Sequence, residues 1–272
     1  MDIPELKAIA KELRVDIIRM LVEAGSGHPG GSLSCIDMLA ALFFHKMRHR
    51  PHDPHWPDRD RFVLSKGHCV PALYAVLAKA GYFPRDELLT LRKLDSRLQG
   101  HPDRHRLPYL EASTGSLGQG LSIALGMALA GKSAQKDYRV YCVISDGECQ
   151  AGQVWEASMA APKFGLDNLC ALLDYNKIQL SGAIKDIMDL EPLLEKWRAF
   201  NWHAVEIDGH DFAAITRALD EAERTKGRPT LILCQTIKGK GVSFMEGRWE
   251  WHGKAPNHEE GERAIQEILA QT

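Results

Sequence analysis

The chain has 272 residues, enough for one large α/β domain or two small ones and for a sizeable buried core. Its 34 basic and 36 acidic residues nearly cancel, which excludes a broad positive surface for nucleic acid but leaves room for a small anionic ligand held locally. The first residues are charged, and no later stretch reaches membrane-spanning length. We therefore expect neither a signal sequence nor contact with a membrane.

The cysteines indicate the compartment. They form no Cys-x-x-Cys pair, and several lie within apolar runs, where a buried thiol behaves as a small hydrophobic side chain. The six are Cys35, Cys69, Cys142, Cys149, Cys170 and Cys234. This usage predicts a reducing, cytoplasmic setting.

Apolar residues recur at intervals of three and four between Ile3 and Leu21, which predicts an amphipathic helix near residues 4–24. A glycine-rich segment, 25–31, is expected to end this helix. Three further helices are expected near residues 34–45, 70–80 and 84–94. Between them, the Pro- and His-rich segment 50–59 predicts a loop.

Short apolar runs rich in β-branched and aromatic residues predict strands that alternate with helices. The strands are expected at residues 61–64, 138–144, 168–173, 202–207 and 229–235. An amphipathic helix separates the runs 138–144 and 168–173, and another is expected to begin at Asp208-Gly-His-Asp211. This alternation predicts one α/β domain over residues 1–272, with a doubly wound, mostly parallel sheet flanked by helices. The glycine-rich segment 238–257 predicts a long loop, either ordered or covering a ligand.

Two polar segments follow neighbouring strands of the predicted sheet. Ser145-Asp-Gly-Glu148 ends one strand, and Asp174-Tyr-Asn-Lys-Ile178 follows the next. An Asp-Gly after a strand is, by itself, most often only a turn. Two parallel strands, however, deliver Asp146 and Asn176 to the same sheet edge, where a carboxylate and an amide oxygen suit Mg²⁺ completed by waters and phosphates. Gly147 would let the backbone approach a phosphate closely.

This spacing resembles the thiamine diphosphate fingerprint, a Gly-Asp-Gly followed after slightly under thirty residues by Asn. Ser145 replaces the first glycine, which leaves the metal ligand and the second glycine in place. Further motifs match transketolase in order along most of the chain. They are Ser26-Gly-His-Pro-Gly-Gly31, Ser65-Lys-Gly-His68, Gly100-His-Pro102, Ser113-Thr-Gly-Ser-Leu-Gly-Gln-Gly120, Thr236-Ile-Lys-Gly-Lys-Gly241 and His252-Gly253. The chain is thus identified as a member of the transketolase family.

The resemblance to transketolases implies a set of site residues. Magnesium, or another divalent cation such as calcium or manganese, would be bound by the side chains of Asp146 and Asn176 and the carbonyl of Ile178. Thiamine diphosphate would contact His68, Gly115, Ser116, Leu117, Gly147 and Asn176. Ser116 stands where the family has proline, which predicts a less rigid loop. The resemblance places His28, His101 and His252 at the sugar, where imidazoles hold hydroxyls and shuttle protons.

Two positions depart from the family. Trp249 stands where transketolases usually carry the first histidine of His-x-x-His-Gly, so a contact to cofactor and substrate is expected to be lost or taken over by His252. Ala151 replaces an acidic residue that many relatives carry shortly after Asp-Gly, whereas Glu156 is kept. In the family these carboxylates help to couple paired active sites, so that coupling is expected to be weaker or rerouted here.

Transketolases are more than twice as long as this chain, and a second domain supplies the glutamate and the aromatic platform for the aminopyrimidine ring. The resemblance therefore implies the N-terminal subunit of a split transketolase, which acts on sugar phosphates with a separate C-terminal subunit, as α2β2. Two alternatives stay open. One is a subunit of another thiamine diphosphate enzyme, such as a 2-oxo acid dehydrogenase or a deoxyxylulose phosphate synthase, and the other is a non-catalytic assembly module.

Overall fold

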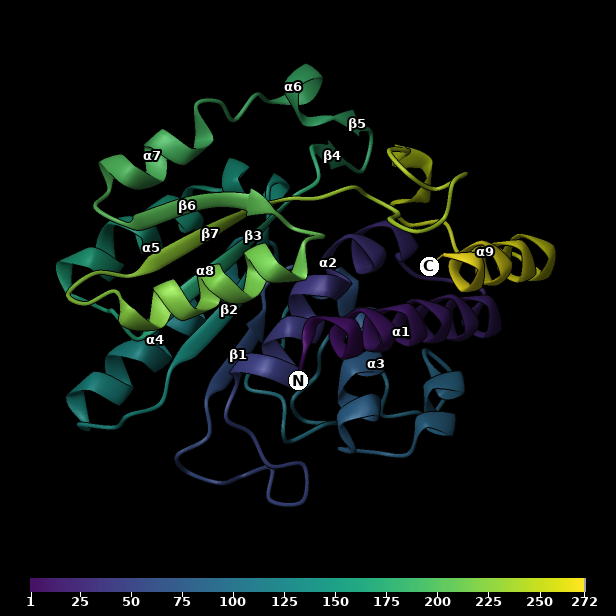
Figure 1. The fold of residues 1–272 in the computed structure, drawn as a ribbon, viewed down its shortest axis with the longest axis horizontal. Helices are drawn as coiled ribbons and strands as arrows, with labels where there is room; N and C mark the ends of the chain where they lie inside the picture. Colours follow the sequence, from purple (N-terminus) through teal and green to yellow (C-terminus); the bar gives the residue numbers. More distant parts are fainter. Residues whose placement is uncertain (272) are drawn as a thin grey trace.

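A computed structural model describes residues 1–271 as a five-stranded, entirely parallel sheet in the order β1-β2-β3-β7-β6 (Figure 1). The strands are β1 (Arg61–Leu64), β2 (Val140–Ser145), β3 (Leu169–Tyr175), β6 (His203–Asp208) and β7 (Thr230–Gln235). A small antiparallel hairpin is formed by β4 (Ile178–Gln179) and β5 (Gly182–Ala183). Helices cover both faces of the sheet, which confirms the predicted doubly wound α/β class.

The α-helices divide between two hydrophobic cores, one on each face of the sheet. The helices are α1 (Ile3–Ala24), α2 (Pro29–Ala41), α3 (Val70–Ala80), α4 (Gln119–Ser133), α5 (Gly152–Lys163), α6 (Ile184–Ile187), α7 (Leu193–Ala199), α8 (Phe212–Arg224) and α9 (His258–Ala270). The first three pack with α8 and α9 on one face, whereas α4, α5 and α7 pack on the other. Figure 1 shows α9 beside α1, where the two helices are in contact.

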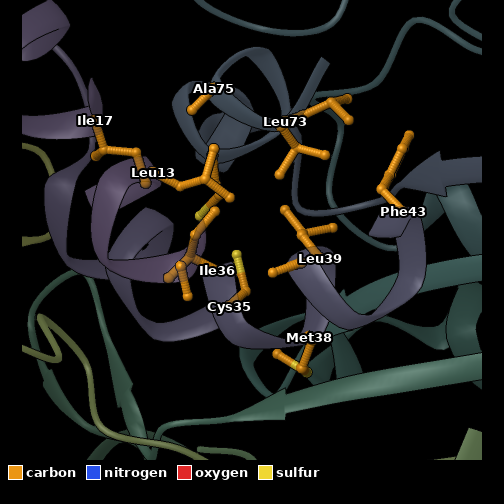
Figure 2. Packing of buried hydrophobic residues seen from close by; sticks show 14 of the residues in the cluster. Leu13, Ile17, Cys35, Ile36, Met38, Leu39, Phe43, Leu73 and Ala75 are labelled. Carbon is orange, nitrogen blue, oxygen red and sulfur yellow. The ribbon is translucent and has the colours of Figure 1, made fainter. Parts of the chain in front are cut away.

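Alternation along each strand sends side chains to opposite cores, as expected for strands buried on both faces. In β2, for example, Tyr141 and Val143 join the core of α1, whereas Cys142 and Ile144 join the core of α5. Figure 2 shows the first core at close range: side chains of α1, α2 and α3 converge, and Met38 lies on the side of α2 that faces the strands. The sheet is therefore a rigid support, and the ends of its strands can position the residues of a functional site.

The order of the strands creates a crevice. The chain runs outward from β1 through β2 to β3, then crosses to the edge strand β6 and returns as β7 beside β3. Ligands of such sheets bind beyond the carboxyl ends of the strands, near the point where the winding reverses. The loops after β1, β2, β3 and β7 meet there.

Most predicted elements are confirmed to within two residues. The first helix begins at Ile3 behind a capping box, in which Asp2 and Glu5 bond each other's backbone N–H at 2.9 Å. The five strands, the helix at 70–80, the helix after Asp211 and the loop at 50–59 are also observed. The segment 238–257 is a loop with one 3-10 turn, Trp249–Trp251.

One predicted helix start is wrong. The second helix begins at Pro29 rather than near Ser34, because Gly30 and Gly31 lie inside it where other segments pack closely. A Cβ on Gly31 would lie 2.5 Å from the sulfur of Cys69, and one on Gly30 would lie 2.8 Å from the carbonyl oxygen of Trp251. These glycines therefore permit close packing and do not end a helix.

The helix predicted over 84–94 is absent. Only a 3-10 helix, Arg85–Thr90, forms there, and Arg92 and Asp95 then take left-handed backbone angles of +61° and +64°. Burial of Leu91 and Leu98 favours this irregular path over a continuous helix. Helices α4, α6, α7 and α9 were not predicted. Among residues 1–271, no helix has the length and apolar character needed to cross a membrane.

Candidate active site

Asp146 lies directly after β2, and its side chain is only 2% exposed. Its two oxygens accept hydrogen bonds from the backbone N–H groups of Gly147 (2.7 Å) and Lys177 (2.6 Å). Burial raises the pKa of the Asp146 carboxyl to about 7, and the negative charge of Asp174 adds to the shift. The two hydrogen bonds hold the ionised carboxylate of Asp146 in place but do not balance its negative charge. A cation bound beside the carboxylate would balance that charge.

Asn176 follows β3 on the neighbouring strand and is also buried. Its Nδ2 donates to Asp174 Oδ2 (3.1 Å), and its Oδ1 accepts from the N–H of Ile178 (3.1 Å). Because β2 and β3 are parallel and adjacent, with Ser145 opposite Asp174, both predicted metal ligands stand at one sheet edge as expected. Asp146, Asn176 and the carbonyl of Ile178 together offer three oxygens of the kind that Mg²⁺ prefers.

A pocket of about 230 Å³ opens at this edge and collects most of the predicted site residues. Its lining includes His68, Leu117, Asp146, Gly147, Asn176, Ile178 and His252. A Cβ on Gly147 would meet nothing nearer than Gln179 Cβ at 3.9 Å, so the space beside this backbone is open to a ligand. The pocket thus joins the predicted metal ligands to the predicted phosphate contacts.

Two buried lysines, Lys66 and Lys238, also line the pocket, and the sequence interpretation gave neither a role. Lys66 forms a buried ion pair with Asp174; burial opposes its charge, but that carboxylate outweighs burial and holds the Lys66 pKa well above its usual range. Lys238 Nζ donates to the carbonyl of Ile178 (3.0 Å). Burial, with the charge of Lys66 adding, lowers the Lys238 pKa to about 8. Lys66 belongs to the motif Ser65-Lys-Gly-His68 and Lys238 to the motif Thr236-Ile-Lys-Gly-Lys-Gly241, both of which resemble transketolase.

The four predicted histidines form one cluster. The His28 ring centroid lies 5.2 Å from that of His68, 6.3 Å from that of His101 and 5.5 Å from that of His252. His28 Nδ1 is buried and has no hydrogen-bond partner among residues 1–271. An orphaned polar atom of this kind is costly unless a ligand or water meets it.

Burial keeps several of these imidazoles neutral. Burial, with the nearby His68 adding, lowers the pKa of His28 to about 4. Burial and the charge of Lys238 lower the pKa of His252 to about 3, and burial and His68 lower the pKa of His101. His252 Nδ1 lies 2.9 Å from Lys238 Nζ, so it accepts from the ammonium group. Neutral imidazoles can accept hydrogen bonds from hydroxyl groups near pH 7.

The loop 113–118 borders the cluster. Gly115 has a backbone φ of +153°, and a Cβ there would lie 3.1 Å from His101 Cδ2, so glycine allows the loop to pass close to this ring. Glu148, another residue without a role in the sequence interpretation, is fully buried and ties the loop to β2. Its carboxylate accepts from the N–H groups of Gly118 (2.9 Å) and Ser145 (2.8 Å).

Not every predicted residue lines the pocket. Ser116 is exposed in its loop, and Gly115, His28 and His101 stand beside the lining rather than in it. Trp249 is 48% exposed, while His252 faces the cluster.

Comparisons with known proteins agree with this geometry. The chain matches the family described as "Transketolase, thiamine diphosphate binding domain" over residues 6–270. It is 47% identical to the 6-deoxy-6-sulfo-D-fructose transketolase subunit of Clostridium sp. (strain MSTE9), covering 97% of this chain and 96% of that subunit. It is 41% identical to an apulose-4-phosphate transketolase subunit of Phocaeicola vulgatus, covering 98% of this chain and 95% of that subunit.

Solved structures of longer proteins show the same fold. Transketolase from Campylobacter jejuni superposes with a TM-score of 0.93 at 33% identity, covering 99% of this chain and 43% of that one. The mammalian transketolases among the relatives are likewise longer, and the chain spans 42% of their length. The match to single subunits is therefore nearly end to end, whereas the match to the longer proteins covers less than half of each.

Proposed function

Because this chain belongs to the transketolase family as its N-terminal, thiamine diphosphate binding domain, we propose that it is one subunit of a two-chain transketolase. The enzyme would transfer a two-carbon ketol unit from a ketose phosphate to an aldose phosphate. The observation that carries the proposal is the near-complete mutual coverage with two proteins named as transketolase subunits, against 43% coverage of a longer transketolase. In this proposal residues 1–272 form a single diphosphate-binding domain.

The residues present fit the cofactor and a divalent cation. Asp146, Asn176 and the Ile178 carbonyl would hold Mg²⁺, Ca²⁺ or Mn²⁺, because a buried carboxylate with a pKa raised to about 7 gains from a neighbouring cation. Gly147 and His68 would meet the diphosphate, and the buried ammonium of Lys238 adds positive charge beside them. Gly115, Ser116 and Leu117 would lie along the cofactor. When bound, thiamine diphosphate supplies the electron sink that lets a carbon–carbon bond beside a ketone break and form again.

The histidines would serve the sugar. His28, with its unpartnered buried nitrogen, and His101 would bind hydroxyl groups and take or return protons as the carbon–carbon bond changes. His252, fixed by Lys238, would present its other ring nitrogen to the same space. Their low pKa values keep the rings neutral near pH 7, so an unprotonated ring nitrogen is free to accept a hydrogen bond from a sugar hydroxyl group.

A partner chain is part of the proposal. Large apolar side chains stand exposed around the pocket and its flanking hairpin, among them Leu180 (64%), Met188 (60%) and Leu117 (46%). Apolar surface beside a ligand pocket is typical of an interface. We propose that the separate C-terminal subunit covers it in an α2β2 assembly, and that the complex works in the cytoplasm, which suits six free, buried cysteines.

The test mixes the purified chain with its C-terminal partner and measures ketol transfer between phosphorylated sugars, with thiamine diphosphate and Mg²⁺ present. We expect turnover only in the mixture. Turnover by the rigorously purified single chain would contradict the two-chain proposal. Cofactor binding without any ketol transfer by the mixture would instead favour another thiamine diphosphate enzyme or an assembly role.

A further inference from the structure

The carboxylate of Asp174 contacts the proposed metal ligand Asn176 and accepts hydrogen bonds from four side chains in all. Asp174, the sixth residue of β3, is completely buried. Its Oδ2 accepts from Ser34 Oγ (2.6 Å), Asn176 Nδ2 (3.1 Å) and the ammonium of Lys66, and its Oδ1 accepts from the hydroxyl of Thr236. These donors come from α2, from the loops after β1 and β3, and from the segment after β7.

The chemistry of this carboxylate decides how Asn176 is oriented. An ionised carboxylate can only accept hydrogen bonds, whereas an amide has one donating and one accepting side. Asn176 must therefore turn its NH₂ group toward Asp174, which leaves its Oδ1 on the opposite side, where the Ile178 N–H donates to it at 3.1 Å. Ser34, Lys66 and Thr236 also donate to Asp174, so the carboxylate is the acceptor in each of its side-chain contacts.

We propose that Asp174 is a positioning residue that fixes the Asn176 amide with its oxygen toward the cation, and so sets the affinity of the site for a divalent metal. This inference rests on the proposed function, since it requires that Asn176 bind the metal. In this inference Asp174 touches neither the metal nor the cofactor, but acts through Asn176, which is proposed to bind the metal. Supporting contacts of this kind typically change metal affinity by about 10- to 100-fold when removed.

The main variant is Asp174→Asn, which keeps the shape of the side chain. An amide at position 174 carries no negative charge, so the ion pair with Lys66 is lost and the amide oxygen is a weaker acceptor for Asn176 Nδ2. Asn176 is then held less firmly with its oxygen toward the cation. We expect the Mg²⁺ concentration that half-saturates thiamine diphosphate binding to rise by about 10- to 100-fold.

A second variant, Asn176→Asp, leaves Asp174 in place and keeps the inference testable if Asp174→Asn does not fold. A carboxylate is by itself a better Mg²⁺ ligand than an amide. At position 176, however, it would place two acceptor-only groups in a contact that is 3.1 Å long in the native protein. We therefore expect weaker metal binding, and tighter binding than in the native complex would overturn the inference.

The double variant Asp174→Asn with Asn176→Asp exchanges the two groups and restores one donor facing one acceptor. We expect its metal affinity to return to within about fivefold of the native value, the non-additive result of directly interacting residues. Asp37→Asn is the matched control. Asp37 is a buried aspartate that pairs with Arg14 (2.6 Å) and does not line the pocket.

The measurement is calorimetric titration of Mg²⁺ into the two-chain complex at a fixed concentration of thiamine diphosphate, with thermal melting as the check on folding. A folded Asp174→Asn complex with unchanged metal dependence would overturn the inference. Failure of the proposed function looks different: Asn176→Ala would then leave metal-dependent cofactor binding intact. The expected pattern is loss in both single variants, recovery in the double variant and no change in Asp37→Asn.

Discussion

The ammonium group of Lys238 lies 3.0 Å from the carbonyl oxygen of Ile178, the same oxygen that the proposed function gives to the metal. Lys238 is only 2% exposed and also contacts His252 Nδ1 at 2.9 Å. One buried ammonium group therefore touches both the carbonyl that is proposed to bind the metal and a histidine that is proposed to face the sugar. Its position makes it a natural donor to a bound diphosphate.

We expect Lys238→Gln to weaken thiamine diphosphate binding by about 10- to 100-fold, because a hydrogen bond from a charged donor contributes about 1.5–3 kcal/mol. Fluorescence titration of the two-chain complex at saturating Mg²⁺ measures the effect. Lys240→Gln is the matched control, since Lys240 pairs with Glu246 on the same loop. Equal affinity in the Lys238 variant and this control would exclude a role for Lys238 at the diphosphate.

Asp146→Ala should abolish magnesium-dependent cofactor binding, with a loss of more than about a hundredfold, because it removes the anionic ligand. Asn176→Ala should weaken binding less, since its oxygen is neutral. Calorimetric titration of the complex checks both. Asp167→Ala is a suitable control, because Asp167 pairs with Lys132 at the amino end of β3, away from the pocket. Unchanged affinity in the Asp146 variant would refute the assignment of the metal ligands.

The convergence of Asp146 and Asn176 could be predicted because it depends on local signals. Two buried apolar runs, each followed by a polar turn, are enough to place both residues at one edge of a parallel sheet. The buried lysines could not be predicted from such signals. Lys66 is stabilised by Asp174, which is 108 positions away, and Lys238 by the Ile178 carbonyl, 60 positions away.

The errors in the helices have a similar cause. The glycine-rich segment 25–31 does end the first helix, at Gly25, but Gly30 and Gly31 lie inside the second helix. Only the packed structure shows Cys69 and Trp251 in the space that side chains at Gly31 and Gly30 would fill. Local propensity also favours a helix at 84–94, where tertiary packing of Leu91 imposes an irregular path.

Folding of the cofactor-free chain should depend on pH through His28. Burial lowers its pKa to about 4 in the folded state, below its ordinary value of 6.5. Between these values the unfolded chain binds more protons, so stability is lost as pH falls from 6.5 toward 4, by up to about 1.4 kcal/mol per pH unit. Asp146, with its pKa raised from 3.8 to about 7, acts in the opposite direction across this whole range, so a comparison of variants is needed.

Urea unfolding at pH 7.5 and pH 5.5 isolates the histidine. Lowering the pH from 7.5 to 5.5 should reduce the free energy of unfolding by about 1 kcal/mol less in His28→Asn than in the native chain. His52→Asn, a change in the exposed loop at 50–59, is the matched control. An identical pH dependence in the His28 variant and the native chain would contradict the effect of burial on this residue.

The last prediction divides the work of the histidines. His28→Ala and His101→Ala should lower turnover far more than they weaken cofactor binding, by about a hundredfold to ten-thousandfold, the usual contribution of acid and base assistance. His68→Ala should do the reverse. His68 lines the pocket with Asp146 and Gly147, where the diphosphate is proposed to lie, whereas His28 and His101 stand beside it with an unpartnered nitrogen on His28.

Two measurements on each variant complex separate these roles: turnover with a ketose phosphate donor at saturating cofactor, and thiamine diphosphate affinity by quenching of tryptophan fluorescence. His105→Ala, in the exposed segment after Gly100-His-Pro102, is the control for loss of a nearby imidazole. Equal losses of affinity in all three variants, with normal turnover at saturation, would show that these histidines bind cofactor and do not act on the sugar. We expect saturating thiamine diphosphate to restore turnover in His68→Ala. In His28→Ala and His101→Ala, we expect the turnover defect to remain at saturating cofactor.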